Sequence, residues 1–409
     1  MKILHIDYET RSEVPLNGAD SVGVWNYACH PSTQPLMLAY AYGDEEPKLW
    51  VCHEGPMPQE LRKGLEDPLQ PLSAFNSAFE RYISKFKVNL DTAISRYEDP
   101  QVGARYLSMP GDLDEVSTIL DLPEHLAKDK RGEELIKLFC EPQIPKKKKG
   151  KLQEPAYWAD WTTHPKEWEQ FKQYCKQDVV SERECARRMK LLGALPLPPF
   201  ERRIWEFDQL VNDRGFPVDV NFVQKAYALA TRAKKEALEQ QNLITGLENA
   251  NSRDQLLPWA KARGYPFNTL RKETVDSVLK DPEVKLTEEC RKVLVARREA
   301  SSTSYQKLSA IMRQVSPDGM LRGQFIYMGS ARCGRWAGNA VQLHNMARPG
   351  VLGKTDAFAG HDFEDIAVVR DARNMVYQED YDGIKKKYGS VLLVVKNVIR
   401  TVFVAPRSA

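Results

Sequence analysis

The sequence predicts an α/β domain with a mixed sheet, followed by a mainly helical region and then a short return to β structure. Three observations predict this order. Apolar runs of strand length come first along the chain, at residues 2–7, 35–42 and 48–53. Longer segments with helical spacing follow, and β character returns only after residue 319. Strands followed by helices are typical of an α/β layer.

Length, composition and charge restrict the class of protein. The 409 residues suffice for two or three domains, and 42% hydrophobic with 28% charged residues is typical of a globular protein. No apolar stretch reaches the length of a membrane span. Seven scattered cysteines without a CxxC pair argue against both a disulfide framework and a zinc site. The net charge of +3 means that any nucleic-acid footprint must be local, and residues 301–350 carry six Lys or Arg but one Asp.

The N-terminal elements follow from apolar pattern and turn residues. After the three strands, "PLSAFNSAFERYISKF" predicts a short strand that runs into a helix. The lysine block at 145–151 predicts an exposed loop, because like charges repel one another. We expect Thr163 to cap a long helix from about Pro165 to Leu192. The proline-rich stretch 193–201 is the best candidate for a domain boundary.

Beyond that stretch the pattern is mainly helical. One helix should stop at Gly215, and Asp219 or Asn221 should begin another that runs through about Gln241. Residues 286–315 read as one long helix with apolar residues at helical spacing. A turn at 317–319 then introduces β structure.

Two carboxylates follow the first apolar run. On a strand, residues i and i+2 point to the same side, so Asp7 and Glu9 should lie side by side. Like charges at that distance raise each other's pKa unless a cation, such as a divalent metal ion, lies between them. The alternative is a surface strand that carries two solvated acids.

Two further pairs fit the metal interpretation. Asn76 and Glu80 are four residues apart on one expected helix, and Tyr174 and Asp178 are four apart on another. Hydrolysis of a phosphodiester by two divalent ions requires several carboxylates that converge on one spot. Magnesium prefers oxygen ligands, and a tyrosine one turn before the last Asp can orient a water molecule.

In this order, the motifs resemble the 3′–5′ proofreading exonuclease domain of DNA polymerase I-like (family A) enzymes, within the DEDD superfamily. The resemblance implies a ribonuclease H-like mixed sheet. It implies metal-site roles for Asp7, Glu9 and Asp178, a metal role through water for Glu80, and water positioning by Tyr174. The family usually has Asp where this chain has Glu80. Asn76 and Phe79 are the candidate DNA contacts beside this site, and an inactive scaffold is the alternative.

A second motif lies in the basic region. Gly334-Arg335 followed by "QLHNM" at 342–346 resembles the family A polymerase motif T-G-R-x₇-L-Q-N, with Cys333 at the Thr position and His344 at the Gln position. The resemblance implies DNA binding by Arg335, Gln342 and Asn345, with the arginine in the minor groove of a primer–template duplex. A structural salt bridge is the alternative role for Arg335.

The resemblance also implies a domain plan. It divides the chain into an exonuclease domain at 1–195, a connector and helical thumb at 196–315, and the start of a polymerase palm at 316–409. The sequence stops before the palm strand that carries the first polymerase aspartate. We therefore expect no polymerisation by this chain alone. The chain would be either a shortened or a naturally split phage-type polymerase, whose remaining palm and fingers are a separate or a deleted segment.

The expected function is metal-dependent 3′–5′ exonuclease proofreading together with DNA gripping by a family A DNA-directed DNA polymerase in DNA replication. The expected cofactor is two Mg²⁺ ions, with Mn²⁺ as a substitute. The expected partners are a single-stranded DNA 3′ end and a primer–template duplex, and no membrane. The expected location is the cytosol of a bacterium or of a phage-infected host. Two alternatives stay open: a stand-alone RNA 3′–5′ exonuclease of the same superfamily, and a non-catalytic DNA-binding accessory module.

Overall fold

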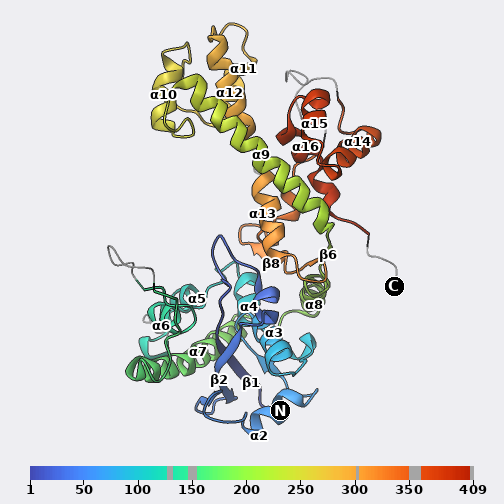
Figure 1. The fold of residues 1–409 in the computed structure, drawn as a ribbon. Coiled ribbons are helices and arrows are strands. Elements are labelled where there is room, and N and C mark those ends of the chain that lie inside the picture. Colours follow the sequence, from blue (N-terminus) through green and yellow to red (C-terminus); the bar gives the residue numbers. More distant parts are fainter. Residues whose placement is uncertain (127–131, 146–153, 301–303, 350–360, 406–409) are drawn as a thin grey trace. The chain divides into compact units, whose positions relative to one another are not determined.

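The structure is a computed structural model that describes residues 1–126, 132–145, 154–300, 304–349 and 361–405. The chain divides into two compact units (Figure 1). The first unit comprises residues 1–215 and 322–342, and the second comprises residues 216–321 and 343–409. The lysine-rich loop predicted at 145–151 lies outside the described residues, apart from residue 145.

A five-stranded mixed sheet forms the centre of the first unit, in the order β3-β2-β1-β4-β5. β1 pairs antiparallel with β2 and parallel with β4, while β3 extends the antiparallel side and β5 the parallel side. This confirms the predicted α/β fold with a mixed sheet. The strands are β1 (Leu4–Arg11), β2 (Gln34–Tyr42), β3 (Lys48–Val51), β4 (Leu72–Ser73) and β5 (Tyr97–Glu98).

Helices cover both faces of this sheet. The described α-helices of the first unit are α1 (Val24–Cys29), α2 (Gln59–Glu66), α3 (Ser77–Lys87), α4 (Pro100–Tyr106), α5 (Leu113–Ile119), α6 (Gly132–Phe139), α7 (Pro165–Leu191) and α8 (Pro199–Arg214). The bounds of α7 match the prediction. The predicted cap by Thr163 is wrong, because His164 occupies the N-cap and the Thr163 hydroxyl instead accepts a hydrogen bond from the Asp160 backbone N–H, at 2.9 Å.

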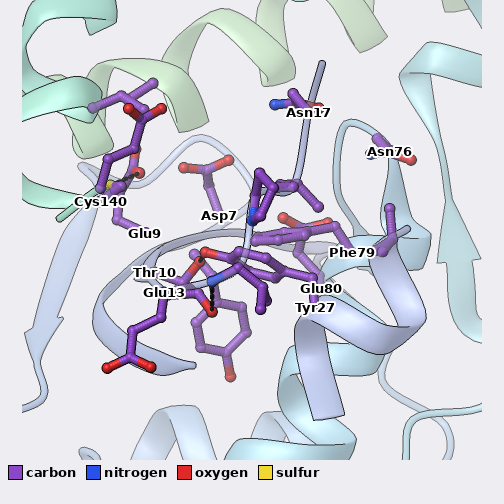
Figure 2. A pocket seen from close by; sticks show the side chains of 18 of the residues that line it. Asp7, Glu9, Thr10, Glu13, Asn17, Tyr27, Asn76, Phe79, Glu80 and Cys140 are labelled. Carbon is purple, nitrogen blue, oxygen red and sulfur yellow. Dashed lines mark hydrogen bonds between the residues drawn. The ribbon is translucent and has the colours of Figure 1, made fainter. Parts of the chain in front are cut away.

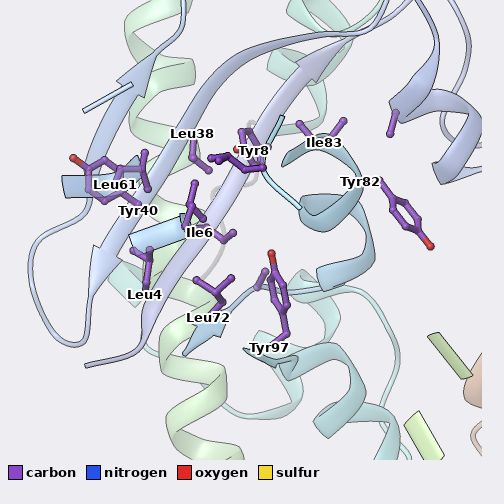
Figure 3. Packing of buried hydrophobic residues seen from close by; sticks show 14 of the residues in the cluster. Leu4, Ile6, Tyr8, Leu38, Tyr40, Leu61, Leu72, Tyr82, Ile83 and Tyr97 are labelled. Carbon is purple, nitrogen blue, oxygen red and sulfur yellow. The ribbon is translucent and has the colours of Figure 1, made fainter. Parts of the chain in front are cut away.

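Alternation along β1 separates an apolar face from a polar one. Leu4, Ile6 and Tyr8 enter a buried cluster with side chains of α2 and α3 (Figure 3). A second cluster joins the other face of β2 to the buried side of α7. Because successive side chains of a strand point to opposite faces, Asp7 and Glu9 point to the α7 side. The fold thus places both acids against α7.

The units do not divide at the proline-rich stretch 193–201. Leu197 and Trp205 are buried in the same cluster as β1, so α8 packs with the first unit, and the division falls at 215/216. A hairpin of β8 (Phe325–Ser330) and β9 (Arg335–Gly338) also belongs to the first unit, because Tyr327 is buried in that cluster. These divisions differ from the predicted domain limits, and the exonuclease, thumb and palm assignments stay predictions.

The second unit is mainly helical. A short antiparallel pair, β6 (Phe216–Pro217) with β7 (Met320–Leu321), accompanies α9 (Val220–Thr245), α10 (Arg253–Lys261), α11 (Lys272–Lys280), α12 (Glu288–Ala300), α13 (Ser304–Gln314), α14 (Ile366–Tyr377), α15 (Tyr381–Tyr388) and α16 (Val391–Val398). Asp219 caps α9 by accepting from the Phe222 N–H at 3.0 Å, one of the two predicted starts. The single long helix predicted at 286–315 is two helices, α12 and α13.

Candidate functional site

A cavity of about 670 Å³ opens beside β1, α3 and α7 in the first unit. Five candidate residues that are far apart in sequence line it: Asp7, Glu9, Glu80, Tyr174 and Asp178. Figure 2 shows Asp7 between Glu9 on one side and Glu80 on the other. The structure therefore brings the complete predicted metal and catalytic set into one cavity.

Strand β1 supplies the first two acids. Asp7 pairs with Ala39 and Glu9 with Met37 of the neighbouring β2, and the register shifts just after Glu9. The sequence had predicted that the acids lie at the end of the strand, but β1 continues to Arg11, so they lie within it. Glu9 is buried, with 8% of its surface exposed, and Asp7 is partly buried. Two carboxylates in this environment, side by side on one face, form a strongly negative site.

Helix α3 supplies Glu80 through an unusual turn. Asn76, immediately before the helix, has a left-handed backbone with φ of 68°. The buried Asp99 carboxylate holds this turn, because it accepts from the Asn76 N–H at 3.1 Å and from the Ser77 N–H and hydroxyl at 2.8 Å. This anchor fixes the first turn of α3 and thereby the place of Glu80. Sequence reasoning missed Asp99, which is 23 residues from Asn76, the residue whose turn it holds.

Glu80 carries the clearest electrostatic signal in the cavity. Its side chain is 3% exposed, and burial, together with the charge of Asp7, raises the pKa of this carboxyl well above its ordinary value. Among the described residues, the Glu80 Oε2 atom has no hydrogen-bond partner. A buried carboxylate oxygen of this kind requires either a proton or a cation. This observation fits a metal ion bound in the cavity.

The raised pKa of Glu80 gives a stability prediction for the metal-free protein. When folding raises the pKa of a carboxyl, the folded state holds more protons than the unfolded state at pH values above the unfolded pKa. The free energy of unfolding therefore falls as the pH rises from the unfolded pKa to the folded pKa. The loss is about 1.4 kcal/mol for each pH unit between the two pKa values. We therefore expect Glu80→Gln to raise the melting temperature in EDTA, by more at pH 8 than at pH 5. An equal gain at both pH values, measured by calorimetry, would contradict the raised pKa.

Helix α7 supplies Tyr174 and Asp178, one turn apart on its buried side. Tyr174 is 1% exposed, and burial, followed by the charge of Asp178, raises the pKa of its phenol. A hydrogen bond to Asp178 raises it further. The phenol is therefore a neutral hydrogen-bond group at physiological pH, suited to orienting a small polar molecule in the cavity.

The position of the Tyr174 ring depends on a glycine of α6. A Cβ atom added at Gly132 would lie 2.2 Å from Cε2 and 2.7 Å from Cζ of Tyr174, much closer than atoms can pack. If the cavity hydrolyses phosphodiesters, as the sequence predicts, Gly132→Ala should displace the ring and lower the hydrolysis rate by up to about 100-fold, the scale of a 1 Å misplacement. Gly55→Ala is the matched control, because an added Cβ there meets nothing within 4 Å. Equal hydrolysis rates for both variants would show that α6 does not position Tyr174.

One wall of the cavity is apolar and aromatic. Phe79 and Tyr27 both line it, with ring centroids 6.2 Å apart, and Asn76 lies at the same side (Figure 2). The Tyr27 hydroxyl is 2.8 Å from the Thr10 hydroxyl, which fixes the Tyr27 ring. Flat rings beside acids can hold a nucleobase while its phosphate meets the metal site. Asn76 and Phe79 thus lie where DNA contacts were predicted.

Two cysteines at the acids were missed by sequence reasoning. The Cys175 Sγ is 3.9 Å from Asp7 Oδ2, and the Cys140 Sγ is 3.9 Å from Glu9 Oε2. Burial, followed by the nearby carboxylates, raises the pKa of both thiols. The only available sequence signal was the position of Cys175 between Tyr174 and Asp178; nothing local marked Cys140.

The predicted residues of the basic motif lie outside this cavity. Arg335 is exposed on β9, where its Nε donates to the Cys333 Sγ at 3.1 Å, and contacts from Ser330 and Arg335 lower the pKa of this thiol to about 7. Within the described parts of the chain, no carboxylate forms an ion pair with Arg335. Gln342 is exposed in the first unit and Asn345 is exposed in the second, so the set is divided between the units.

The donor set of the cavity suits a divalent metal ion. Asp7, Glu9, Glu80 and Asp178 line the cavity, and ligand atoms of Asp7 and Glu9 lie within 4.8 Å of each other and of the Cys175 thiol, which is buried behind them in the core. Carboxylate oxygens are the preferred ligands of Mg²⁺ and Mn²⁺.

None of the described helices is both long enough and apolar enough to span a membrane.

Comparisons with known proteins relate this chain to DNA polymerases. No family model matches the chain. The chain is 32% identical over 405 residues to a DNA polymerase of Bacillus phage SP02, which covers 99% of this chain and 58% of that polymerase. The fold is similar to the POL domain of Pol1 from M. smegmatis, solved in complex with DNA primer-template and dNTP. That likeness has a TM-score of 0.51 and 13% identity, and covers 84% of this chain and 52% of the solved one.

Proposed function

We propose that the first unit of this chain, which is 32% identical to a phage DNA polymerase along 99% of its length, is a metal-dependent 3′–5′ DNA exonuclease of a family A polymerase. The observation that carries the proposal is the single cavity into which β1, α3 and α7 bring Asp7, Glu9, Glu80, Tyr174 and Asp178. The chain spans 58% of the length of the phage polymerase, so the activity of that whole protein is not assigned to it. This exonuclease would act during DNA replication in the cytosol of a bacterial or phage-infected cell.

Each side chain has a role in this proposal. Asp7, Glu9 and Asp178 would hold two Mg²⁺ ions directly, or Mn²⁺ in their place, and Glu80 would contact them through water. When bound, such ions activate a water molecule and neutralise the charge that develops on the phosphate. The Glu80 Oε2 atom, which has no hydrogen-bond partner among the described residues, would then be satisfied.

Tyr174 and the apolar wall would position the reactants. The Tyr174 phenol stays protonated, so it can donate one hydrogen bond and accept another from a water molecule. Phe79 would stack on the terminal base, and Asn76 would hydrogen-bond to the nucleotide at the same wall. These contacts read no particular base, as proofreading of any 3′ end requires.

The second unit has a surface suited to duplex DNA. None of the described residues that line a cavity of about 480 Å³ is a carboxylate, although Arg298 pairs with Asp276 and Lys235 with Glu239 beside it. Five of the described lining residues are cationic: Lys234, Lys235, Lys272, Arg297 and Arg298. They come from α9, α11 and α12, which lie within the range 196–315 that was predicted to be connector and thumb. Lys and Arg clusters of this kind bind phosphates independently of sequence. We therefore propose that this unit grips primer–template DNA.

Degradation of end-labelled single strands tests the exonuclease proposal. The full chain is incubated with 5′-labelled DNA or RNA of one sequence, with Mg²⁺ or with EDTA. We expect DNA to shorten stepwise from its 3′ end with Mg²⁺ alone. A preference for RNA would favour the stand-alone RNA exonuclease, and DNA binding without any degradation would favour a non-catalytic accessory module.

A separate prediction tests duplex recognition by Arg335. If this exposed arginine contacts the minor groove, Arg335→Ala should weaken duplex DNA binding by about 1–3 kcal/mol, similarly across sequences. Arg332→Ala is the charge-matched control, because Arg332 is exposed in the same hairpin. Affinity is measured by fluorescence anisotropy beside the single-strand degradation rate, which should stay unchanged. Equal losses of affinity for the two variants would show that Arg335 contributes only general charge.

A further inference from the structure

A second cavity, of about 220 Å³, lies in the first unit next to the acidic cavity that contains Asp7. It is lined by residues of α1, α3, α4 and α8 and of the segment 322–339. Val24 and Asn76 line both cavities, so the two adjoin at the turn that precedes α3. Asp99, whose carboxylate holds this turn, lines the second cavity as well. A DNA strand that extends from the acidic cavity past this turn would enter the second one.

The second cavity contains an arginine whose donors are not used. Arg105, on α4, is partly buried and lines the cavity. Among the described residues, its guanidinium has no hydrogen bond and no ion pair. Burial lowers the pKa of this group, although the charges of Asp99 and Asp208 act in the opposite direction. An arginine stays charged in proteins, so its buried donors require water or an anion as a partner.

Neither acid of the second cavity is that partner. From the described residues, the Asp99 carboxylate accepts four hydrogen bonds at the starts of α3 and α4. The Asp208 carboxylate accepts three from the same part of the chain, the shortest of them from the Trp336 Nε1–H at 2.7 Å. Both acids are therefore held by other donors, and the Arg105 guanidinium stays open to an external anion.

The backbone holds this guanidinium in place. A Cβ atom added at Gly111 would lie 2.9 Å from Nη2 and 3.2 Å from Nε of Arg105, so the glycine packs against the guanidinium. The Gln101 side chain donates to the Gly111 carbonyl at 2.7 Å and fixes that segment. Arg322 adds a second positive charge, with its guanidinium carbon 4.4 Å from the centre of the Trp25 ring. A fixed fork of N–H donors matches the oxygens of a phosphate.

We propose that the second cavity binds a backbone phosphate of the DNA strand whose 3′ end lies in the acidic cavity, and that Arg105 donates the hydrogen bonds to this phosphate. Arg105 is then a positioning residue, because it holds the strand and does not touch the reacting atoms. Phosphate contacts fix the register of a strand without reading its sequence. The inference rests on the proposed exonuclease function, which supplies the 3′ end in the acidic cavity.

Single methylphosphonate linkages in an oligothymidine strand test for this phosphate, because each replaces one charged phosphate with a neutral group. Affinity is measured by fluorescence anisotropy in EDTA, so that the strand is not degraded. We expect one linkage near the 3′ end to weaken binding to the wild type by about 10- to 100-fold, the worth of a hydrogen bond to a charged group. The same linkage should cost nothing in Arg105→Gln, because its partner is already absent. Equal losses in the two proteins would overturn the proposal.

Two further variants complete the binding test. Arg62→Gln is the matched control, because Arg62 is exposed on α2, pairs with Glu66 and lines neither cavity. It should keep the wild-type loss at the sensitive linkage. Arg105→Lys keeps the charge without the fork of donors and should bind the unmodified strand with intermediate affinity, which also preserves the test if Arg105→Gln does not fold. Wild-type affinity in both Arg105 variants would overturn the proposal.

Degradation rates of the same proteins with Mg²⁺ separate this inference from the exonuclease proposal. The substrates are the unmodified strand and the p-nitrophenyl ester of thymidine 5′-monophosphate, which has no upstream phosphate. Arg105→Gln should raise KM for the strand about tenfold and leave kcat/KM for the ester within about twofold. Equal losses on both substrates, or degradation without any linkage that is coupled to Arg105, would overturn this inference alone. A coupled linkage without degradation by any of the proteins would support the phosphate contact and contradict the exonuclease proposal.

Discussion

Asp7→Ala and Asp178→Ala should each lower the rate of 3′-end degradation by about 10³-fold or more. Metal ions supply several kcal/mol of stabilisation to the charged transition state, and each variant removes a side chain proposed to hold them. The fold should persist, because each change removes a negative charge from an acidic cavity. The rates are measured on single-stranded DNA at saturating Mg²⁺.

Asp91→Ala is the matched control for loss of an acid in the same unit. Asp91 is exposed, contacts Lys85 at 2.8 Å and does not line the cavity. Its removal should leave the degradation rate unchanged. Near-normal, metal-dependent activity in Asp7→Ala or Asp178→Ala would show that the cavity is not the site of hydrolysis.

Tyr174→Phe should slow turnover by about 10- to 1000-fold, the scale of one lost positioning hydrogen bond. Metal binding should hardly change, because the acids remain and the ring still fills its place between α6 and the acids. Single-turnover rates and Mn²⁺ affinity are measured on the same preparation. Tyr97→Phe is the control, because Tyr97 is also fully buried in the first unit but lies outside the cavity. Equal single-turnover rates for Tyr174→Phe and the wild type would remove Tyr174 from the mechanism.

The acidic site was predictable because its signals are local. Asp7 and Glu9 share a strand face through a period of two, while Glu80 and the Tyr174–Asp178 pair follow helical spacing. The Asp7–Glu9 and Tyr174–Asp178 patterns survive in the structure, whereas the prediction that Asn76 and Glu80 share one helix is wrong, because Asn76 lies just before α3 with a left-handed backbone. That the three elements meet in one cavity came from the family resemblance, not from periodicity.

The two thiols show what local patterns cannot supply. Cys140 and Cys175 reach Glu9 and Asp7 only through the packing of distant elements onto β1. The residues of these two contacts are 131 and 168 positions apart in the sequence, so no local spacing could have indicated either contact.

The unit boundary differed from the prediction for a similar reason. A proline-rich stretch predicts a linker, yet Leu197 within it and Trp205 beyond it are buried against the first sheet. The β8–β9 hairpin also joins the first unit through Tyr327, although more than 100 residues separate it from α8. Contacts of that sequence separation depend on the tertiary fold and leave no periodic signal.

Diffraction from crystals that contain Mn²⁺ and a deoxynucleoside monophosphate would test the central claim most directly. The claim is that the cavity between β1, α3 and α7 binds two divalent ions around a phosphate. We predict two anomalous peaks about 4 Å apart, the spacing of two-metal sites, beside Asp7, Glu9 and Asp178, with the phosphate between them. Absence of Mn²⁺ from the cavity, or a nucleotide bound elsewhere, would contradict the account.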